Sequence, residues 1–243
     1  MKEVLLIIDP QNDFVDPKGS LYIPKAEKAI ESLCEVIKTR NPNRIIITQD
    51  THQAHHIGHS SWWKEDPAPF TKITLSEVEE GKYSPRRYRD KGLRDYMTKL
   101  PNKTHIIWPE HCLEGSWGWA FPDNLIKSLS KWQRKNFGKN YEIVQKGTDP
   151  NHEMYSAITR IDRSGIGLKY NSLIKTLALY DKVLVCGFAK DVCVAWTVKD
   201  LLASGMFKDK LVFLDSCMTA LDDSAEILSV YKDCEDNYGS VWE

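Results

Sequence analysis

Short apolar runs that each end in a polar or charged residue constrain the fold of this chain more than any other feature. The runs are rich in β-branched residues and have the composition of strands buried on both faces. Between them, apolar residues recur at spacings of three and four, the period of a helix with one buried face. This alternation favours a mostly parallel sheet with right-handed crossovers. The expected strands are Val4–Ile8, Ile45–Ile47, Ile106–Ile107, Tyr141–Gly147, Val183–Cys186 and Leu211–Leu214.

The helical periods and the length of the chain, 243 residues, fit one α/β domain spanning 1–243. Residues 60–104 are the least regular part, so they are expected to form an insertion or an active-site lid. The expected helices are Pro24–Thr39, Ser76–Gly81, Leu93–Leu100, Asn124–Trp132, Tyr170–Tyr180, Val192–Gly205 and Ser224–Tyr231.

Composition excludes several classes of partner. The formal net charge of −1 gives no electrostatic case for nucleic acid or an anionic membrane. No apolar run approaches the ~20 residues of a membrane span, and Val4–Ile8 is too short for a signal peptide. The six cysteines form no CxxC pair. We therefore expect a cytoplasmic protein with reduced thiols.

Two strand ends deliver charged side chains. Pro10 cannot continue a central strand, so the first strand stops near Asp9 and places its carboxylate at the sheet edge where ligand sites gather. Asp9 could equally be a turn or cap residue, and Asp13 is expected to be an ordinary turn residue. Lys146 falls at another strand end, where it is either a surface charge or a cation that pairs with Asp9.

Cys193 lies in the first turn of the helix that follows the strand Val183–Cys186. The positive end of the helix dipole favours a thiolate there, although most free cysteines are simply small buried residues. Asp9, Lys146 and Cys193 together would supply an acid/base, a cation and a nucleophile, which are the groups that covalent acyl transfer requires. The amides of Ala189 and Cys193 could form the oxyanion hole.

A second polar group follows the strand Ile45–Ile47. Asp50 and His52 alternate beyond the strand end and can therefore point to the same side. His55, His56 and His59 come within the next residues, and His111 follows a later short strand. A carboxylate with several imidazoles suits Zn²⁺, Fe²⁺ or Mn²⁺, but a polar loop with surface histidines would have the same pattern.

Five motifs in order along the chain resemble those of the isochorismatase-like cysteine hydrolase superfamily, and of its nicotinamidases in particular. They span nearly the whole sequence, and together they are far more specific than each is alone. The motifs are LLIIDPQNDF (Leu5–Phe14), QDTH (Gln49–His52), WPEHC (Trp108–Cys112) followed by Gly115 and Gly118, KG (Lys146–Gly147) and GFAKDVCV (Gly187–Val194).

The resemblance implies a three-layer α/β/α sandwich around a six-stranded, mostly parallel sheet. It also implies hydrolysis of a small heteroaromatic amide such as nicotinamide to the acid and ammonia. Asp9 would shuttle the proton, Lys146 would be the oriented cation, and Cys193 would form a thioester. A cis peptide bond is implied between Phe188 and Ala189.

The resemblance further implies a substrate site and one divalent metal, with zinc preferred over iron or manganese. Phe14 and Trp108 would sandwich the ring, with Phe188 as a further substrate-binding residue. The spacing does not decide whether His59 or His56 is the fourth ligand of the metal. The other ligands would be Asp50, His52 and His111.

Besides the undecided fourth ligand, a second departure from the family pattern leaves alternatives open. The spacing from Asp50 to His111 exceeds that of typical nicotinamidases, so the segment 60–104 could admit a different amide. One alternative is a metal-independent isochorismatase-like hydrolase that acts on another small amide or a vinyl ether. Another is a catalytically silent binding protein on the same fold. Family members are often homodimers or homotetramers.

Overall fold

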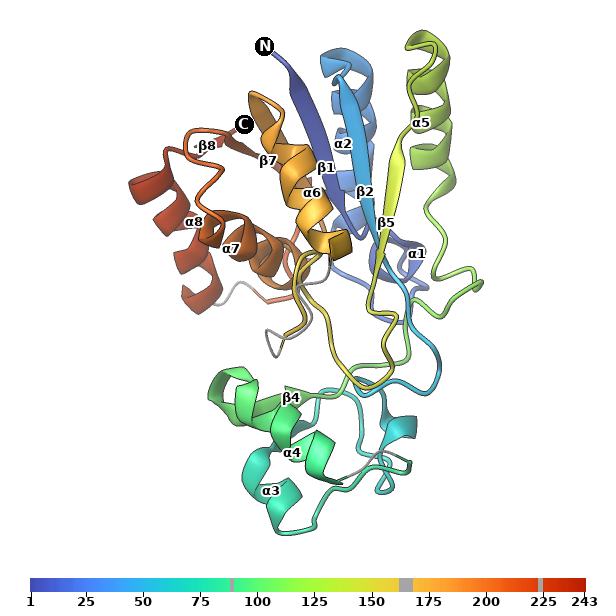
Figure 1. The fold of residues 1–243 in the computed structure, drawn as a ribbon. Helices are drawn as coiled ribbons and strands as arrows, with labels where there is room; N and C mark the ends of the chain where they lie inside the picture. The colour runs from blue at the N-terminus through green and yellow to red at the C-terminus, as the bar shows by residue number, and fades with distance from the viewer. Residues whose placement is uncertain (88–89, 162–167, 223–224) are drawn as a thin grey trace.

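A six-stranded sheet forms the centre of the protein, for which the computed structural model describes residues 1–87, 90–161, 168–222 and 225–243. The strand order is β5-β2-β1-β6-β7-β8, and all neighbouring strands are parallel (Figure 1). These strands are β1 (Glu3–Ile8), β2 (Arg44–Asp50), β5 (Glu142–Lys146), β6 (Lys182–Gly187), β7 (Leu211–Met218) and β8 (Val241–Trp242).

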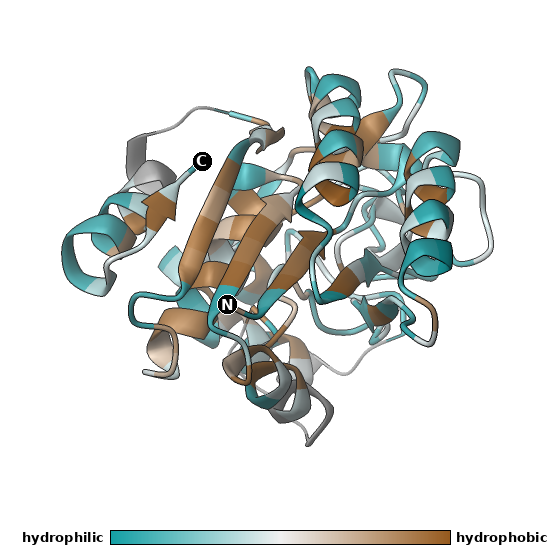
Figure 2. Cartoon of the chain, turned by 90° about the horizontal axis from the view of Figure 1, so that it is seen from above, coloured by the Kyte–Doolittle hydropathy of each residue, from teal (hydrophilic) through white to brown (hydrophobic). Residues whose placement is uncertain are grey.

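Helices cover both faces of the sheet, which confirms the three-layer α/β/α fold. Alternate residues of β1 explain the layering, because Leu5 and Ile7 join one apolar cluster while Leu6 and Ile8 join the other. Seen from above, the strands form an apolar band between more polar helices (Figure 2). The first cluster includes residues of α2 (Ala26–Arg40) and α5 (Asp123–Lys135), and the second includes residues of α6 (Leu168–Ala178), α7 (Ala195–Ala203) and α8 (Ala225–Tyr238).

Six of the seven helices lie within a few residues of their expected positions. The last one, α8, extends to Tyr238 rather than ending at Tyr231, and its expected start, Ser224, is outside the described residues. Within the described part of the chain, no helix is both long enough and apolar enough to cross a membrane.

One strand expected for the main sheet lies elsewhere. β4 (Thr104–Ile106) pairs antiparallel with β3 (Lys72–Thr74) in a separate two-stranded sheet. The sixth central strand is instead β8, which adds only two residues beside β7. A pairing this short leaves no periodic pattern in the sequence, which is why the C-terminal strand was not expected.

Residues 57–107, called here the 57–107 unit, form an apolar core together with Tyr155 and Ile161 beyond the carboxyl end of the sheet (Figure 1). Trp62 and Trp63 are both buried in this core. A capping box between Thr74 and Glu77 begins one of its helices. The helical elements of the unit are α3 (Leu75–Glu79), α4 (Asp90–Lys99), η1 (Ser60–Trp62) and η2 (Pro101–Lys103). Outside the unit, the short helix α1 (Asn12–Val15) follows β1.

Gly187, at the end of β6, is a position where we expect a side chain to destabilise the fold. Its φ is +117°, and an added Cβ would lie 2.1 Å from the carbonyl oxygen of Ile8. Gly187→Ala should lower the free energy of unfolding by at least about 3 kcal/mol, through backbone strain and overpacking together. Urea denaturation measures this loss.

Gly138 provides the matched control for backbone strain alone. Its φ is +83°, and nothing lies within 4 Å of an added Cβ. Gly138→Ala should therefore cost only about 1 kcal/mol. Equal losses in the two variants would show that contact with Ile8 does not constrain position 187.

Candidate active site

The candidate catalytic residues meet where the strand order reverses. From β1 the chain proceeds outward to β2 and β5, and it then returns to form β6 on the other side of β1. Ligands of open α/β sheets bind outside the carboxyl ends of the strands at such a switch point. Asp9 follows β1 directly. Cys193 lies in the π-helical turn η3 (Lys190–Val194), which follows β6 and leads into α7.

Lys146, the last residue of β5, is the centre of this group. Its Nζ lies 3.0 Å from Asp9 Oδ2 and 3.0 Å from Asp50 Oδ1. Nζ also lies 3.6 Å from Cys193 Sγ and donates a hydrogen bond of 3.0 Å to the Met154 carbonyl. Burial alone would lower the pKa of Lys146, but Asp50 and Asp9 hold that pKa well above its usual value. Lys146 is therefore a buried, permanently charged ammonium.

Asp9 and Cys193 are both poised to carry a proton. Burial raises the pKa of Asp9, although Lys146 opposes the shift. Burial also raises the pKa of the Cys193 thiol well above its usual value, and the carboxylate of Asp9 adds to this while Lys146 opposes it. The helix-dipole argument for a resting thiolate is thus outweighed by desolvation. A base must take the thiol proton, and the nearby carboxylate of Asp9 can accept it.

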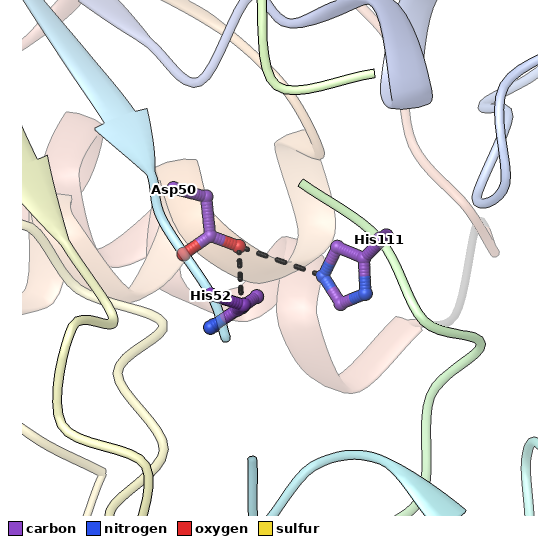
Figure 3. Close-up of side chains that lie close together, drawn as sticks. All are labelled: Asp50, His52 and His111. Atoms are coloured by element: carbon purple, nitrogen blue, oxygen red, sulfur yellow. Dashed lines mark hydrogen bonds and ion pairs between the residues drawn. The ribbon is translucent and has the colours of Figure 1, made fainter. Parts of the chain in front are cut away.

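Asp50, His52 and His111 converge on a single point (Figure 3). His52 Nε2 lies 3.0 Å from Asp50 Oδ2, and His111 Nε2 lies 3.5 Å from the same oxygen. The Nδ1 of His52 lies 3.1 Å from the Gly147 carbonyl oxygen, and the Nδ1 of His111 lies 2.7 Å from the Pro109 carbonyl oxygen.

Those carbonyls fix the tautomer of each ring, because a carbonyl oxygen only accepts hydrogen bonds. When the ring is neutral, its proton is therefore assigned to Nδ1, which leaves a lone pair on Nε2. Asp50 raises the pKa of His52 against the effect of burial, so without a metal a proton on Nε2 bridges His52 and Asp50. A divalent metal ion would take the place of that proton between the ring nitrogens and the carboxylate oxygen. The donor set thus fits a divalent metal ion bound through Nε2.

His59 and His56 differ in the hydrogen-bond partner of Nδ1, and therefore in the nitrogen that carries the proton. His59 places Nδ1 3.3 Å from the Ala54 carbonyl and keeps a buried Nε2 with no hydrogen-bond partner among the described residues. In His56, Nδ1 instead accepts a hydrogen bond of 3.2 Å from the Gly58 amide. Its proton is therefore assigned to Nε2, which is also buried without a hydrogen-bond partner among the described residues but is a donor rather than a lone-pair ligand. His59 thus has a ligand-type tautomer and His56 does not.

Backbone pairing brings these distant segments together. The His52 amide donates to the Cys112 carbonyl at 3.0 Å, and the Glu114 amide donates back to the His52 carbonyl at 3.0 Å. The Trp108 amide donates to the Gly58 carbonyl at 2.7 Å. These bonds hold the segments that contain His111 and His59 next to Asp50 and His52. His55 is exposed and stays apart from it.

A small cavity opens beside Cys193. Phe14 and Trp108 line it as expected, whereas Phe188 is fully buried in the core and is not among the described lining residues. Trp108 is held by its indole N–H, which donates to the Tyr155 hydroxyl at 3.0 Å. The lining residues are Phe14, Leu21, Ile23, Asp50, Trp108, His111, Glu153, Tyr155, Ala189, Val192, Cys193 and Leu221.

The turn that carries the expected oxyanion hole has the implied geometry. The peptide bond between Phe188 and Ala189 is cis. Within the described residues the Ala189 amide has no hydrogen-bond acceptor, so it is available to a ligand in the cavity that Ala189 lines.

The sequence assigned no role in the site to several residues that belong to it. Gln11 holds Asp50 by its backbone, accepting from the Asp50 amide at 2.7 Å and donating to its carbonyl at 2.7 Å. Asp13 is not a local turn residue, because its Oδ2 accepts a hydrogen bond of 2.6 Å from the Cys112 amide. Glu153 and Tyr155 line the cavity although no motif marked them. Gln11 and Asp13 lie within the motif Leu5–Phe14, next to Asp9, and this position is the signal that could have suggested a role for them.

Comparisons with known proteins agree with this geometry, although no protein-family model matches the chain. Over 233 residues the chain is 28% identical to the nicotinamidase of Saccharomyces cerevisiae, which covers 94% of this chain and 93% of the relative. The structure of the yeast nicotinamidase bound to the inhibitor nicotinaldehyde superimposes with a TM-score of 0.73 at 26% identity, covering 99% and 100% of the two chains. The pyrazinamidase of Pyrococcus horikoshii in complex with zinc has a TM-score of 0.59 at 21% identity, covering 100% and 99%.

Fold and site together define an α/β protein with a cysteine, a lysine and an aspartate at the switch point of its sheet. The likenesses in sequence and structure support the isochorismatase-like superfamily for this chain. Within that superfamily the chain resembles the nicotinamidases.

The charges around Cys193 predict that its thiol becomes more reactive in Asp9→Asn. Because the charge of Asp9 raises the pKa of Cys193, its removal should lower that pKa and increase the thiolate fraction. Alkylation of Cys193 by iodoacetamide at pH 7.5 should become about threefold to tenfold faster, since each unit of pKa changes the thiolate fraction of a mostly protonated thiol tenfold.

Peptide mapping by mass spectrometry measures this rate, and Cys193→Ala identifies the labelled peptide. Slower labelling in Asp9→Asn would show that Asp9 activates the resting thiol, contrary to the electrostatics described above.

Proposed function

We propose that this chain is an amidase that hydrolyses nicotinamide, or a closely related heteroaromatic amide, to the acid and ammonia. The convergence of Asp9, Lys146 and Cys193 beside a cavity lined by Phe14 and Trp108 carries this proposal. The similarity to nicotinamidases along nearly the whole chain supports the choice of substrate.

In the first half of the proposed reaction, Cys193 Sγ attacks the amide carbonyl carbon and its proton passes to Asp9. The raised pKa of Asp9 suits it to hold this proton. Lys146 keeps Asp9 and Sγ in place. The amides of Ala189 and Cys193 stabilise the oxyanion of the tetrahedral intermediate. Asp9 then protonates the leaving nitrogen, the C–N bond breaks, and ammonia departs from a Cys193 thioester.

In the second half, Asp9 is a carboxylate again and accepts a proton from an attacking water. The hydroxide oxygen forms a bond to the acyl carbon, and the C–S bond of the thioester breaks. The proton returns to Sγ, so the acid product leaves with Asp9 and Cys193 in their starting states.

Asp50, His52, His111 and His59 would hold one divalent metal ion. We propose zinc, with iron or manganese as alternatives suited to the same ligands. The tautomer of His59 supports it over His56 as the fourth ligand. When bound, the metal would take the ring nitrogen of the substrate and so orient its amide toward Cys193.

The remaining expectations extend this proposal. Residues 60–104 form most of the 57–107 unit, and we propose that they act as a lid within a single domain spanning 1–243. The reaction would belong to NAD salvage in the cytoplasm. We also propose that the protein forms a homodimer or homotetramer and has no nucleic-acid or membrane partner.

Cys193→Ala tests the covalent mechanism. Ammonia release from nicotinamide should fall by at least about 10⁴-fold, because removing a nucleophile eliminates the whole catalytic unit. Bound metal should remain, since Cys193 is not among the proposed ligands. Cys34→Ala, which changes a cysteine on α2, should retain full activity. Ammonia release by Cys193→Ala at a rate near that of the native enzyme would exclude the thioester mechanism.

Paired histidine variants test the metal site. His59→Ala should weaken zinc affinity by about 10-fold to 100-fold, while His56→Ala should retain the affinity of the native protein within about threefold. Competition with a chromophoric chelator measures both affinities. A larger loss in His56→Ala would reverse the assignment of the fourth ligand. A metal-free native enzyme with full activity would instead support a metal-independent hydrolase.

A further inference from the structure

Glu153 is a buried carboxylic side chain at the cavity that the proposed reaction does not use. Only 3% of its surface is exposed, and it lines the same cavity as Cys193. Its Oε1 accepts a hydrogen bond of 2.9 Å from the Met154 amide, and the Met154 carbonyl accepts from Lys146. Glu153 is thus joined to the catalytic lysine through a single residue.

The surroundings of Glu153 include two histidines, and against the effect of burial Asp50 and Glu153 raise the pKa of one of them, His52. His56 and Gly58 pack beside it, and an added Cβ on Gly58 would lie 2.5 Å from Glu153 Oε2. Burial, together with nearby histidines, holds the pKa of His56 well below its usual value, so that ring is neutral. Within the ranges that the structure describes, no lysine or arginine forms an ion pair with Glu153.

Glu153 is also near the metal cluster, since Glu153, His52 and His56 place ligand atoms within 4.8 Å of one another. A second metal ion is disfavoured at this point. The Nδ1 of His56 accepts the Gly58 amide proton, so its Nε2 carries a hydrogen rather than a free lone pair.

Counting charges shows what Glu153 contributes, and the count rests on the metal of the proposed function. Lys146 supplies one positive charge and a divalent ion supplies two. Asp9 and Asp50 supply two negative charges, which would leave the site positive by one. The carboxylate of Glu153 brings the total to zero. In a buried cavity such a difference is weakly screened.

We propose that Glu153 sets the charge selectivity of the cavity, so that a neutral amide is bound and the anionic acid product is disfavoured. A cavity positive by one would attract a carboxylate and retain the product. With Glu153 present, the acid product becomes a negative ion, once it has lost its proton to ammonia or water, in a site that has no surplus positive charge. Glu153 is thus a specificity-determining residue that favours release of the acid.

Glu153→Gln tests this role, because glutamine keeps the shape and the hydrogen bond from Met154 but removes the charge. In zinc-loaded protein, the dissociation constant for nicotinate should fall about tenfold, equivalent to ~1.4 kcal/mol. The KM for nicotinamide should change much less. Isothermal titration calorimetry measures nicotinate binding directly, and product inhibition of ammonia release provides a second readout.

Two further variants separate charge from shape. Glu153→Asp keeps the charge and should bind nicotinate as weakly as the native protein. Glu31→Gln removes the same charge from the exposed surface of α2 and should leave nicotinate binding unchanged. Tighter binding of nicotinate to Glu153→Gln alone supports the proposal.

Other outcomes overturn it. Unchanged nicotinate binding in Glu153→Gln would mean that no charge is lost at position 153. Equal tightening of amide and acid would indicate reshaping of the cavity. A fall from two bound zinc ions to one would mean that Glu153 is a metal ligand. If the native protein releases no ammonia from nicotinamide, the proposed function fails, whereas failure confined to the variant comparison removes only the role of Glu153.

Discussion

The buried ammonium of Lys146 is the interaction on which the rest of the site depends. It is 1% exposed and lies between the carboxylates of Asp9 and Asp50. A charge removed from water in this way is stable only with close partners and further hydrogen bonds, and removing one partner leaves an uncompensated buried charge. The strand order supplies the partners, because Lys146 is in register with Asp50 on β2, and β2 lies beside β1.

The same lysine links the two chemical halves of the site. Its contact with Asp9 and Cys193 belongs to acyl transfer, and its contact with Asp50 belongs to the histidine cluster. Gly147 follows directly, with φ at +71°, and an added Cβ there would lie 2.7 Å from Asp50 Oδ1. The chain after β5 can therefore pass close to the cluster only because this residue is glycine.

The segment after β5 also joins the 57–107 unit to the catalytic group. The Ile57 amide donates to the Pro150 carbonyl at 2.8 Å, and further along the segment Met154 binds Lys146 and Tyr155 binds Trp108. The apolar core of the unit includes Tyr155 and Ile161 of this segment, so the unit and the segment pack together. A few backbone and side-chain hydrogen bonds thus connect the 57–107 unit to Trp108 in the cavity wall and to Lys146.

The sequence by itself determined the alternation of strands and helices, and with it the strand ends that carry Asp9, Asp50, Lys146 and Cys193. Apolar periodicity is a local property of the sequence, so it can be recognised without a structure. The resemblance also implied the three-layer fold and the cis bond before Ala189, and both are present.

Only the tertiary structure decided which distant groups meet and how each is protonated. The short strand before His111 belongs to a separate sheet, so His111 reaches Asp50 through loop pairing rather than through a neighbouring central strand. The different roles of His59 and His56 depend on the hydrogen-bond partner of each Nδ1, and Glu153 reaches the cavity through a long loop. Protonation follows from burial and from partners far apart in the chain, and a local sequence pattern contains neither.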